Sequence, residues 1–196
     1  MIKQIVKVGL GLSLIASTLL AAPEKTKLKI GFIALTDCAP LVIAKEKGFF
    51  AEEGLDVHVA KEGGGWPGIQ QKVISGEYDF SHALAGMPIA ATLGINGNAN
   101  LQALLSLDFN GNAITYGNNI IEKMEEFGLD KTERPVTAES LKKYIDAKRA
   151  KEGNKYQPLS FGMVHPVSTH NYELRYWMAS SGIRPDPNSS IFSIML

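Results

Sequence analysis

The sequence contains a single cysteine, Cys38, among 196 residues. One cysteine cannot form an internal disulfide, and it cannot supply the several thiolate ligands of a Cys-rich zinc site or an iron–sulfur cluster. An excess of charge is missing too: 20 Lys and Arg balance 20 Asp and Glu, so the formal net charge is zero. No basic cluster suggests a nucleic-acid interface. These absences exclude disulfide-rich folds, Cys-ligated metal centres and binding to nucleic acid by charge.

A hydrophobic run of membrane-spanning length is also missing. The apolar run from Val8 to Leu20 is shorter than the about 20 residues that cross a bilayer. It follows two lysines and precedes two alanines, which is the order of a secretory signal peptide. We therefore predict a signal peptide over residues 1–21 and a periplasmic location for the exported chain. A retained membrane anchor is the alternative.

Export would leave the chain slightly acidic. Residues 1–21 contain two lysines and no acid, so the remainder has 18 basic and 20 acidic residues and a formal net charge of −2. Such a chain does not attract anions over a distance. Any anion that it binds has to be held by local groups.

Strand-like and helical segments alternate along the first half of the chain. The strand-like runs cover residues 28–35, 55–62, 78–85 and 101–107, and the helical runs between them cover residues 41–54, 69–77 and 89–95. This alternation is typical of α/β units with a largely parallel sheet. Pro40, Pro67 and Pro88 each lie where a helix should begin, a position that tolerates the missing N–H of proline. The strand-to-helix turns of such a sheet gather at its carboxyl edge, where ligands bind and helix N-termini favour anions.

The pattern changes after residue 107. A stretch rich in Asn and Gly is followed by polar helices within residues 118–150, a strand-like run at 158–164 and a helix that ends near Gly182. We predict lobe one over residues 22–109 and lobe two over residues 110–196. Only one strand-like run follows the last helix, so we expect lobe two to be incomplete. A truncated or frameshifted product is the alternative.

Four stretches resemble a known family. They are GFIALTDCAPLVIAKEKGFF, GGGWPGIQQKVISGEYDFSHAL, LDFNGNAITYGN and HPVSTHNYELRYWMASSGIRPD. They are similar to the solute-binding proteins of nitrate, sulfonate and taurine ABC transporters, and most of all to the nitrate- and bicarbonate-binding branch. The resemblance implies a two-lobed, periplasmic-binding-protein-like α/β fold (type II). It also implies that a small oxyanion, nitrate or nitrite by preference, is bound between the lobes and delivered to a permease in the inner membrane.

The resemblance implies ligand roles for seven residues. They are Thr36, Asp37, Gly65, Trp66, Gly68, Asn112 and His170. Trp66 is similar to the tryptophan that lines the anion pocket, and an indole offers a flat apolar wall with an N–H donor. Asn112 stands where the nitrate-binding proteins tend to have Gln, and His170 matches a histidine of the family. We expect no cofactor and no metal.

Several of these residues also have a purely structural interpretation. A tryptophan beside glycines can anchor a turn, and buried Cys38 is expected to pack as a small apolar residue. His82 lies near the carboxyl end of a predicted strand and is a further candidate for the crevice. The spacing of Tyr172, Tyr176 and Trp177 on the last helix predicts packing in the core.

Enzymatic functions are less well supported. His165 and His170 are five residues apart, which is not the i, i+4 spacing of a zinc-binding helix, and Ser168 lacks the glycines of a nucleophile elbow. Related synthases of the thiamine pyrimidine precursor carry a Cys-rich iron motif that one cysteine cannot provide. A nitrate sensor on the same lobes conflicts with the predicted export. We therefore predict a binding protein and no enzyme, with bicarbonate, cyanate, sulfonates or taurine as alternative ligands.

Overall fold

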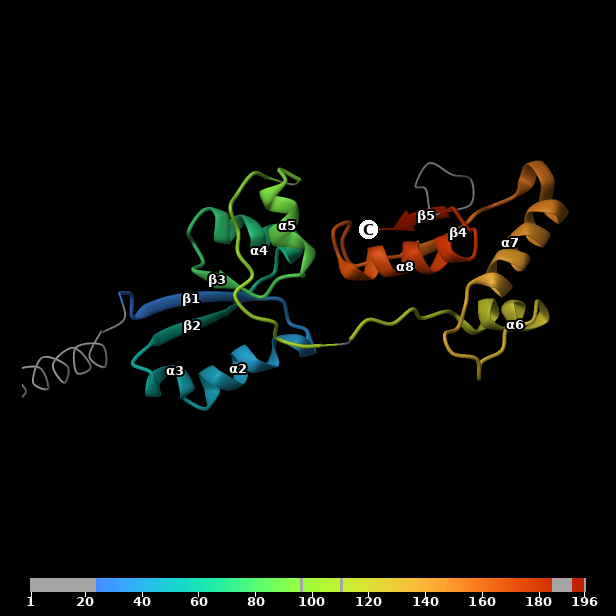
Figure 1. Ribbon diagram of the computed structural model, residues 1–196. Coiled ribbons are helices and arrows are strands. Elements are labelled where there is room, and N and C mark those ends of the chain that lie inside the picture. Colours follow the sequence, from blue (N-terminus) through green and yellow to red (C-terminus); the bar gives the residue numbers. More distant parts are fainter. Residues whose placement is uncertain (1–23, 96, 110, 185–191, 196) are drawn as a thin grey trace, which may run out of the picture.

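The computed structural model describes residues 24–95, 97–109, 111–184 and 192–195. Two α/β units are joined by an extended segment (Figure 1). We call residues 24–95 the N-terminal unit, and residues 117–184 together with 192–195 the C-terminal unit. The predicted signal peptide lies outside the described residues, and within them no helix is long and apolar enough to cross a membrane. The lobe boundary between residues 109 and 110 stays a prediction.

The N-terminal unit contains a sheet of three parallel strands in the order β2-β1-β3. The strands are β1 (Lys27–Phe32), β2 (Asp56–Lys61) and β3 (Phe80–Ser81). The helices are η1 (Thr36–Cys38), α2 (Ala39–Glu46), α3 (Phe49–Glu52), α4 (Gly65–Ile74) and α5 (Gly86–Thr92). The predicted parallel α/β arrangement is therefore confirmed, and each of the three prolines lies in the first turn of its helix.

Three predicted segments differ from the structure. The predicted helix over residues 41–54 is divided into α2 and α3 at Gly48, whose φ of 82° does not fit a right-handed helix. The third strand is only two residues long. The prediction of a fourth strand over residues 101–107 is wrong: this segment forms no strand, and Leu104 and Leu105 are 65% and 71% exposed.

The core of the N-terminal unit lies against the sheet and includes one residue from the C-terminal unit. Its buried members are Trp66, Ile69, Tyr78, Met87, Ala90 and Val167. The central strand requires glycine at position 31, because a Cβ there would lie 2.3 Å from the ring of Tyr78. The absence of a side chain at Gly31 lets the Tyr78 ring pack directly on the strand.

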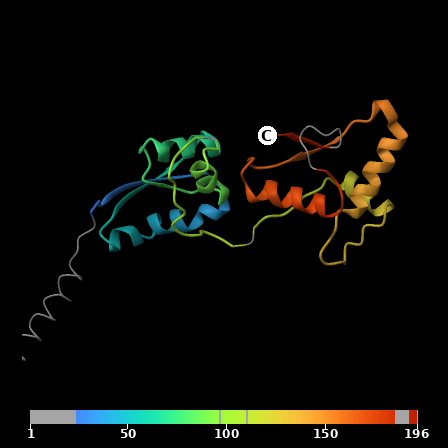
Figure 2. The same ribbon diagram turned by 45° about the horizontal axis from the view of Figure 1, so that its top comes forward.

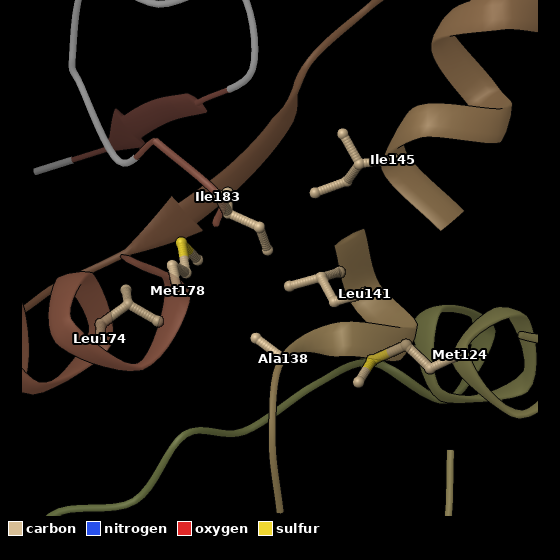
Figure 3. Packing of buried hydrophobic residues seen from close by; sticks show 7 residues of the cluster. All are labelled: Met124, Ala138, Leu141, Ile145, Leu174, Met178 and Ile183. Carbon is tan, nitrogen blue, oxygen red and sulfur yellow. The ribbon is translucent and has the colours of Figure 1, made fainter. Parts of the chain in front are cut away.

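The C-terminal unit packs helices against a two-stranded parallel sheet of β4 and β5. Its elements are α6 (Asn118–Glu126), α7 (Glu139–Glu152), η2 (Gly153–Lys155), β4 (Leu159–Gly162), α8 (Thr169–Ser180) and β5 (Phe192–Met195). Figure 3 shows its core, which is formed by Met124, Ala138, Leu141, Ile145, Leu174, Met178 and Ile183. The prediction that Tyr172 and Tyr176 pack in the core is wrong, since they are 53% and 77% exposed. They lie on the face of α8 opposite to its buried Leu174 and Met178.

The loop before α8 is the place where the two units meet. It lies beside α5 in both views (Figures 1 and 2). Val167 of this loop is 6% exposed within the N-terminal core. A Cβ at Gly86, the first residue of α5, would lie 2.0 Å from the carbonyl oxygen of Val167. Glycine at position 86 therefore permits this close approach between the units.

Candidate functional site

Three strand-to-helix turns meet at the carboxyl edge of the N-terminal sheet. Asp37 lies in η1 after β1, Trp66 lies in α4 after β2, and His82 directly follows β3. The Nε2 atom of His82 lies 3.1 Å from Oδ2 of Asp37. On its other side the His82 ring meets the Trp66 ring edge to face, with a centroid distance of 5.1 Å. We call Asp37, Trp66 and His82 the edge cluster.

The glycines around Trp66 suggested that it anchors a turn. In the structure it is instead the second residue of α4. Its side chain is 8% exposed and belongs to the N-terminal core. The helix begins one residue earlier, at Gly65, whose φ of 67° favours glycine. Trp66 therefore combines two roles that the sequence could not separate, since it supports the core and also forms part of the edge cluster.

The glycine turn before α4 is held by an acidic side chain. One carboxylate oxygen of Glu62 accepts a hydrogen bond of 2.7 Å from the backbone N–H of Gly64. The other oxygen accepts from the hydroxyl of Tyr78 at 3.0 Å and lies 3.0 Å from Nζ of Lys72. The N–H of Gly64 is thus already bonded within the protein. Gly68 lies one turn further on, where a Cβ would be 3.7 Å from the same carboxylate.

These contacts lower the pKa of Glu62 from its ordinary value of 4.5 to about 2, with the Gly64 hydrogen bond as the largest cause and Lys72 next. The unfolded chain therefore binds this proton more tightly than the folded chain. We expect the stability that Glu62 contributes to be present above pH 4.5 and to be lost as the pH falls toward 2. Glu62→Gln should flatten the pH dependence of the free energy of unfolding in this range, measured by urea denaturation. Glu53→Gln, which changes an exposed carboxylate, is the control and should leave the slope unchanged.

A second group of predicted residues gathers at the start of α8. The side-chain amide of Asn112 donates a hydrogen bond of 2.9 Å to Oγ1 of Thr169, 57 residues away. Ser168 caps the helix by accepting from the N–H of Asn171. His170 follows in the first turn, and its Nδ1 atom is buried without a hydrogen-bond partner among the described residues. The structure thus brings Asn112 and His170 to one helix end.

His170 also lines a cavity of about 520 Å³, which is formed by the C-terminal unit together with residues 113–116 of the connecting segment. Most of the other lining residues are apolar, such as Ile114, Phe161 and Leu174. The hydroxyl of Tyr116 is buried there without a partner among the described residues, and burial raises its pKa. A cavity of this size is typical of larger organic ligands and exceeds what an anion of few atoms fills. It does not by itself define an anion site.

The two groups of residues are connected through the loop before α8. Val167 packs in the same core as Trp66, and Thr169 and His170 follow it directly in the chain. Thr36 is exposed in η1 beside Asp37. The structure therefore collects Thr36, Asp37, Gly65, Trp66 and Gly68 at one edge, and Asn112 and His170 at the helix that follows the connecting loop.

A metal site does not emerge from the histidines. Nδ1 of His165 accepts a hydrogen bond from the N–H of Val167, and burial lowers the pKa of His165. Within the described part of the chain, no three His, Cys, Asp or Glu residues lie close enough together to hold a metal ion. His165 therefore stabilises the turn before α8. Cys38 is buried, as the sequence predicted, and His58 is exposed on β2.

The fold is that of a parallel α/β protein, in which the strand-to-helix turns of the N-terminal sheet lie near the loop that leads into α8. The chain belongs to the NMT1-like family, whose model matches residues 21–194. The periplasmic nitrate-binding protein NrtA from Synechocystis PCC 6803 has a matching crystal structure, with a TM-score of 0.66 and 33% sequence identity over 89% of this chain. The predicted fold class is confirmed by this match.

Two relatives from Synechocystis, the organism of this NrtA, have names that refer to nitrate and to bicarbonate. The nitrate import ATP-binding protein NrtC of Synechocystis sp. is 40% identical over 87% of this chain. The bicarbonate transport ATP-binding protein CmpC of the same organism is 38% identical over 83% of it. The chain spans 23% and 22% of these two relatives, and 42% of the NrtA chain. This partial coverage is consistent with a second lobe of which the chain supplies only a part.

Proposed function

We propose that the chain is a solute-binding component of an ABC importer that captures a small oxyanion in the periplasm. Nitrate or nitrite is the preferred ligand, and the bound anion is delivered to a permease in the inner membrane. The observation that carries this proposal is the match to NrtA over 89% of the chain. The family model covers residues 21–194, a range that includes both groups of site residues. The ATP-binding relatives in nitrate import and bicarbonate transport support a role beside such a transporter.

The site residues fit the chemistry of a small oxyanion. Trp66 supplies a flat wall, and the amide of Asn112 and the imidazole of His170 supply hydrogen-bond donors. A ligand of few atoms binds tightly only when nearly every atom is contacted, which requires enclosure from two sides. A hinge motion of the N-terminal unit against the start of α8 would provide this enclosure.

Thermal unfolding with added anions tests the proposal. A ligand that binds only the folded chain, present at about 100 times its Kd, stabilises it by about 2.7 kcal/mol. We expect nitrate or nitrite to raise the Tm of the full chain, while chloride at equal ionic strength leaves it unchanged. Bicarbonate and taurine are measured in parallel.

The pattern of shifts decides between the ligands. If bicarbonate alone raises the Tm, the ligand is bicarbonate and not nitrate. Bicarbonate is the anion in the name of the relative CmpC. A cooperative transition that no anion shifts would contradict anion binding by this chain.

A further inference from the structure

His82 lies at the centre of the edge cluster, although the resemblance gives it no role. It is 4% exposed and directly follows β3, an edge strand of the sheet, next to the turn that follows the central strand β1. Asp37 approaches it from η1, and Trp66 approaches it from α4. Each of its neighbours is a residue for which a ligand role was predicted.

The hydrogen bonds of this cluster are incomplete. The contact of 3.1 Å between Nε2 of His82 and Oδ2 of Asp37 uses one nitrogen of the ring and one oxygen of the carboxylate. The other nitrogen, Nδ1 of His82, and the other oxygen, Oδ1 of Asp37, are buried without a partner among the described residues. Buried polar atoms are nearly always hydrogen-bonded in folded proteins, and an exception calls for an explanation such as an absent ligand.

We propose that His82 donates a hydrogen bond from Nδ1 to the bound oxyanion, and that Asp37 is the residue that positions its ring. This inference rests on the proposed function of anion binding. It adds a ligand-contacting residue at the edge where Trp66 forms the wall.

The chemistry follows from the Asp37 contact. A carboxylate only accepts hydrogen bonds, so Nε2 of His82 carries a proton. Nδ1 is then an acceptor when the ring is neutral and a donor when the ring is protonated. Nitrate and nitrite only accept, so they can pair with Nδ1 only in the protonated state. Binding of nitrate is therefore coupled to protonation of His82, whereas an oxyanion that carries its own O–H can donate to the neutral ring.

Other titratable groups lie on the elements packed around the edge cluster. Glu62 and Lys72, before and within α4, pair with each other, and Tyr78 bonds to this pair. The loop that contacts this core brings His165, which already accepts a hydrogen bond from Val167. Asp37 is the charged group in direct contact with the His82 ring. A substitution of Asp37 is therefore the most direct test of the coupling between nitrate binding and protonation of His82.

The first measurement is titration calorimetry of the full chain with nitrate at two pH values, about 5 and about 8, which bracket the range in which histidine side chains commonly change charge. One coupled proton weakens binding by up to about tenfold per pH unit once the ring has lost its proton. His82→Asn should weaken nitrate binding at the lower pH by about tenfold or more and remove the pH dependence. His58→Asn changes an exposed histidine on β2 and should behave as the unchanged chain does.

Asp37→Asn separates positioning from direct contact. The asparagine oxygen still accepts from Nε2, but the charge that stabilises the protonated ring is gone. We expect weaker nitrate binding at the lower pH and a smaller difference between the two pH values. Stronger binding would mean that Asp37 only repels the anion, and it would overturn the positioning role.

A measurement on the unchanged chain guards against variants that fail to fold. The ring nitrogen signals of the four histidines are followed by NMR with and without nitrate. A protonated Nδ1 on His82 that shifts with nitrate supports the proposal. Nitrate binding that leaves these signals and the His82→Asn affinity unchanged overturns it while anion binding stands. No binding of any oxyanion by the unchanged chain would overturn the proposed function and this inference together.

Discussion

Trp66→Ala is expected to abolish nitrate binding and to lower the free energy of unfolding by about 3–5 kcal/mol. Both effects follow from the position of the side chain, which is 8% exposed and packs with Ile69 and Met87 while its ring meets that of His82. Loss of binding alone would not prove a ligand role, because a destabilised sheet edge loses its geometry too. A second substitution has to separate the two contributions.

Trp66→Phe provides this separation. Phenylalanine keeps an apolar ring in the core, but it has no N–H to donate. We expect most of the stability to remain and nitrate binding to weaken by about tenfold or more, which corresponds to one lost hydrogen bond to a charged ligand. Urea denaturation measures the first quantity and titration calorimetry measures the second.

The chain contains its own control, since it has two tryptophans. Nε1 of Trp177 donates a hydrogen bond of 2.7 Å to the carbonyl of Val136 in the C-terminal unit. Trp177→Phe removes this bond and should lower stability without changing the Kd for nitrate. Equal affinities of Trp66→Phe and Trp177→Phe would contradict a hydrogen bond from the indole N–H of Trp66 to the ligand.

The sheet of the N-terminal unit could be predicted because its signals are local. β1 and β2 overlap the strand-like runs, and the prolines mark the starts of α2, α4 and α5. The prediction of a strand over residues 101–107 was wrong because strand formation also depends on contacts far away in the sequence. A strand needs a partner, and apolar composition alone cannot show whether an edge is free to accept it.

The candidate site was predictable only in part. The resemblance led to Trp66, Asn112 and His170, but their contacts depend on residues far away in the sequence. Asn112 bonds to Thr169 across 57 positions, and His82 meets Asp37 across 45. The position of His82 directly after a parallel strand was the available signal, since residues there face the ligand edge of such sheets. Nothing in the sequence indicated that Glu62 turns back onto Gly64.

Leu141→Ala is expected to lower the free energy of unfolding of the C-terminal unit by about 2–5 kcal/mol. Leu141 is 0% exposed and lies among Met124, Ile145 and Met178 (Figure 3). Removal of its isobutyl group leaves a cavity that helices held on several sides cannot fill completely. Leu104→Ala is the matched control, because Leu104 is 65% exposed and its loss should change stability by less than about 0.5 kcal/mol.

The same substitution tests whether the two units are separate bodies. No residue belongs to both cores, although Val167 of the C-terminal unit packs in the N-terminal core. Each core contains or contacts one tryptophan, Trp66 in the N-terminal unit and Trp177 in the C-terminal unit. In single-tryptophan backgrounds, Leu141→Ala should lower the Tm reported by Trp177 more than the Tm reported by Trp66. Equal shifts would mean that Val167 couples the units into one cooperative body, and the boundary proposed between residues 109 and 110 would then be wrong. Unequal shifts would support two rigid units around a hinge, which is the arrangement that closure on a small anion requires.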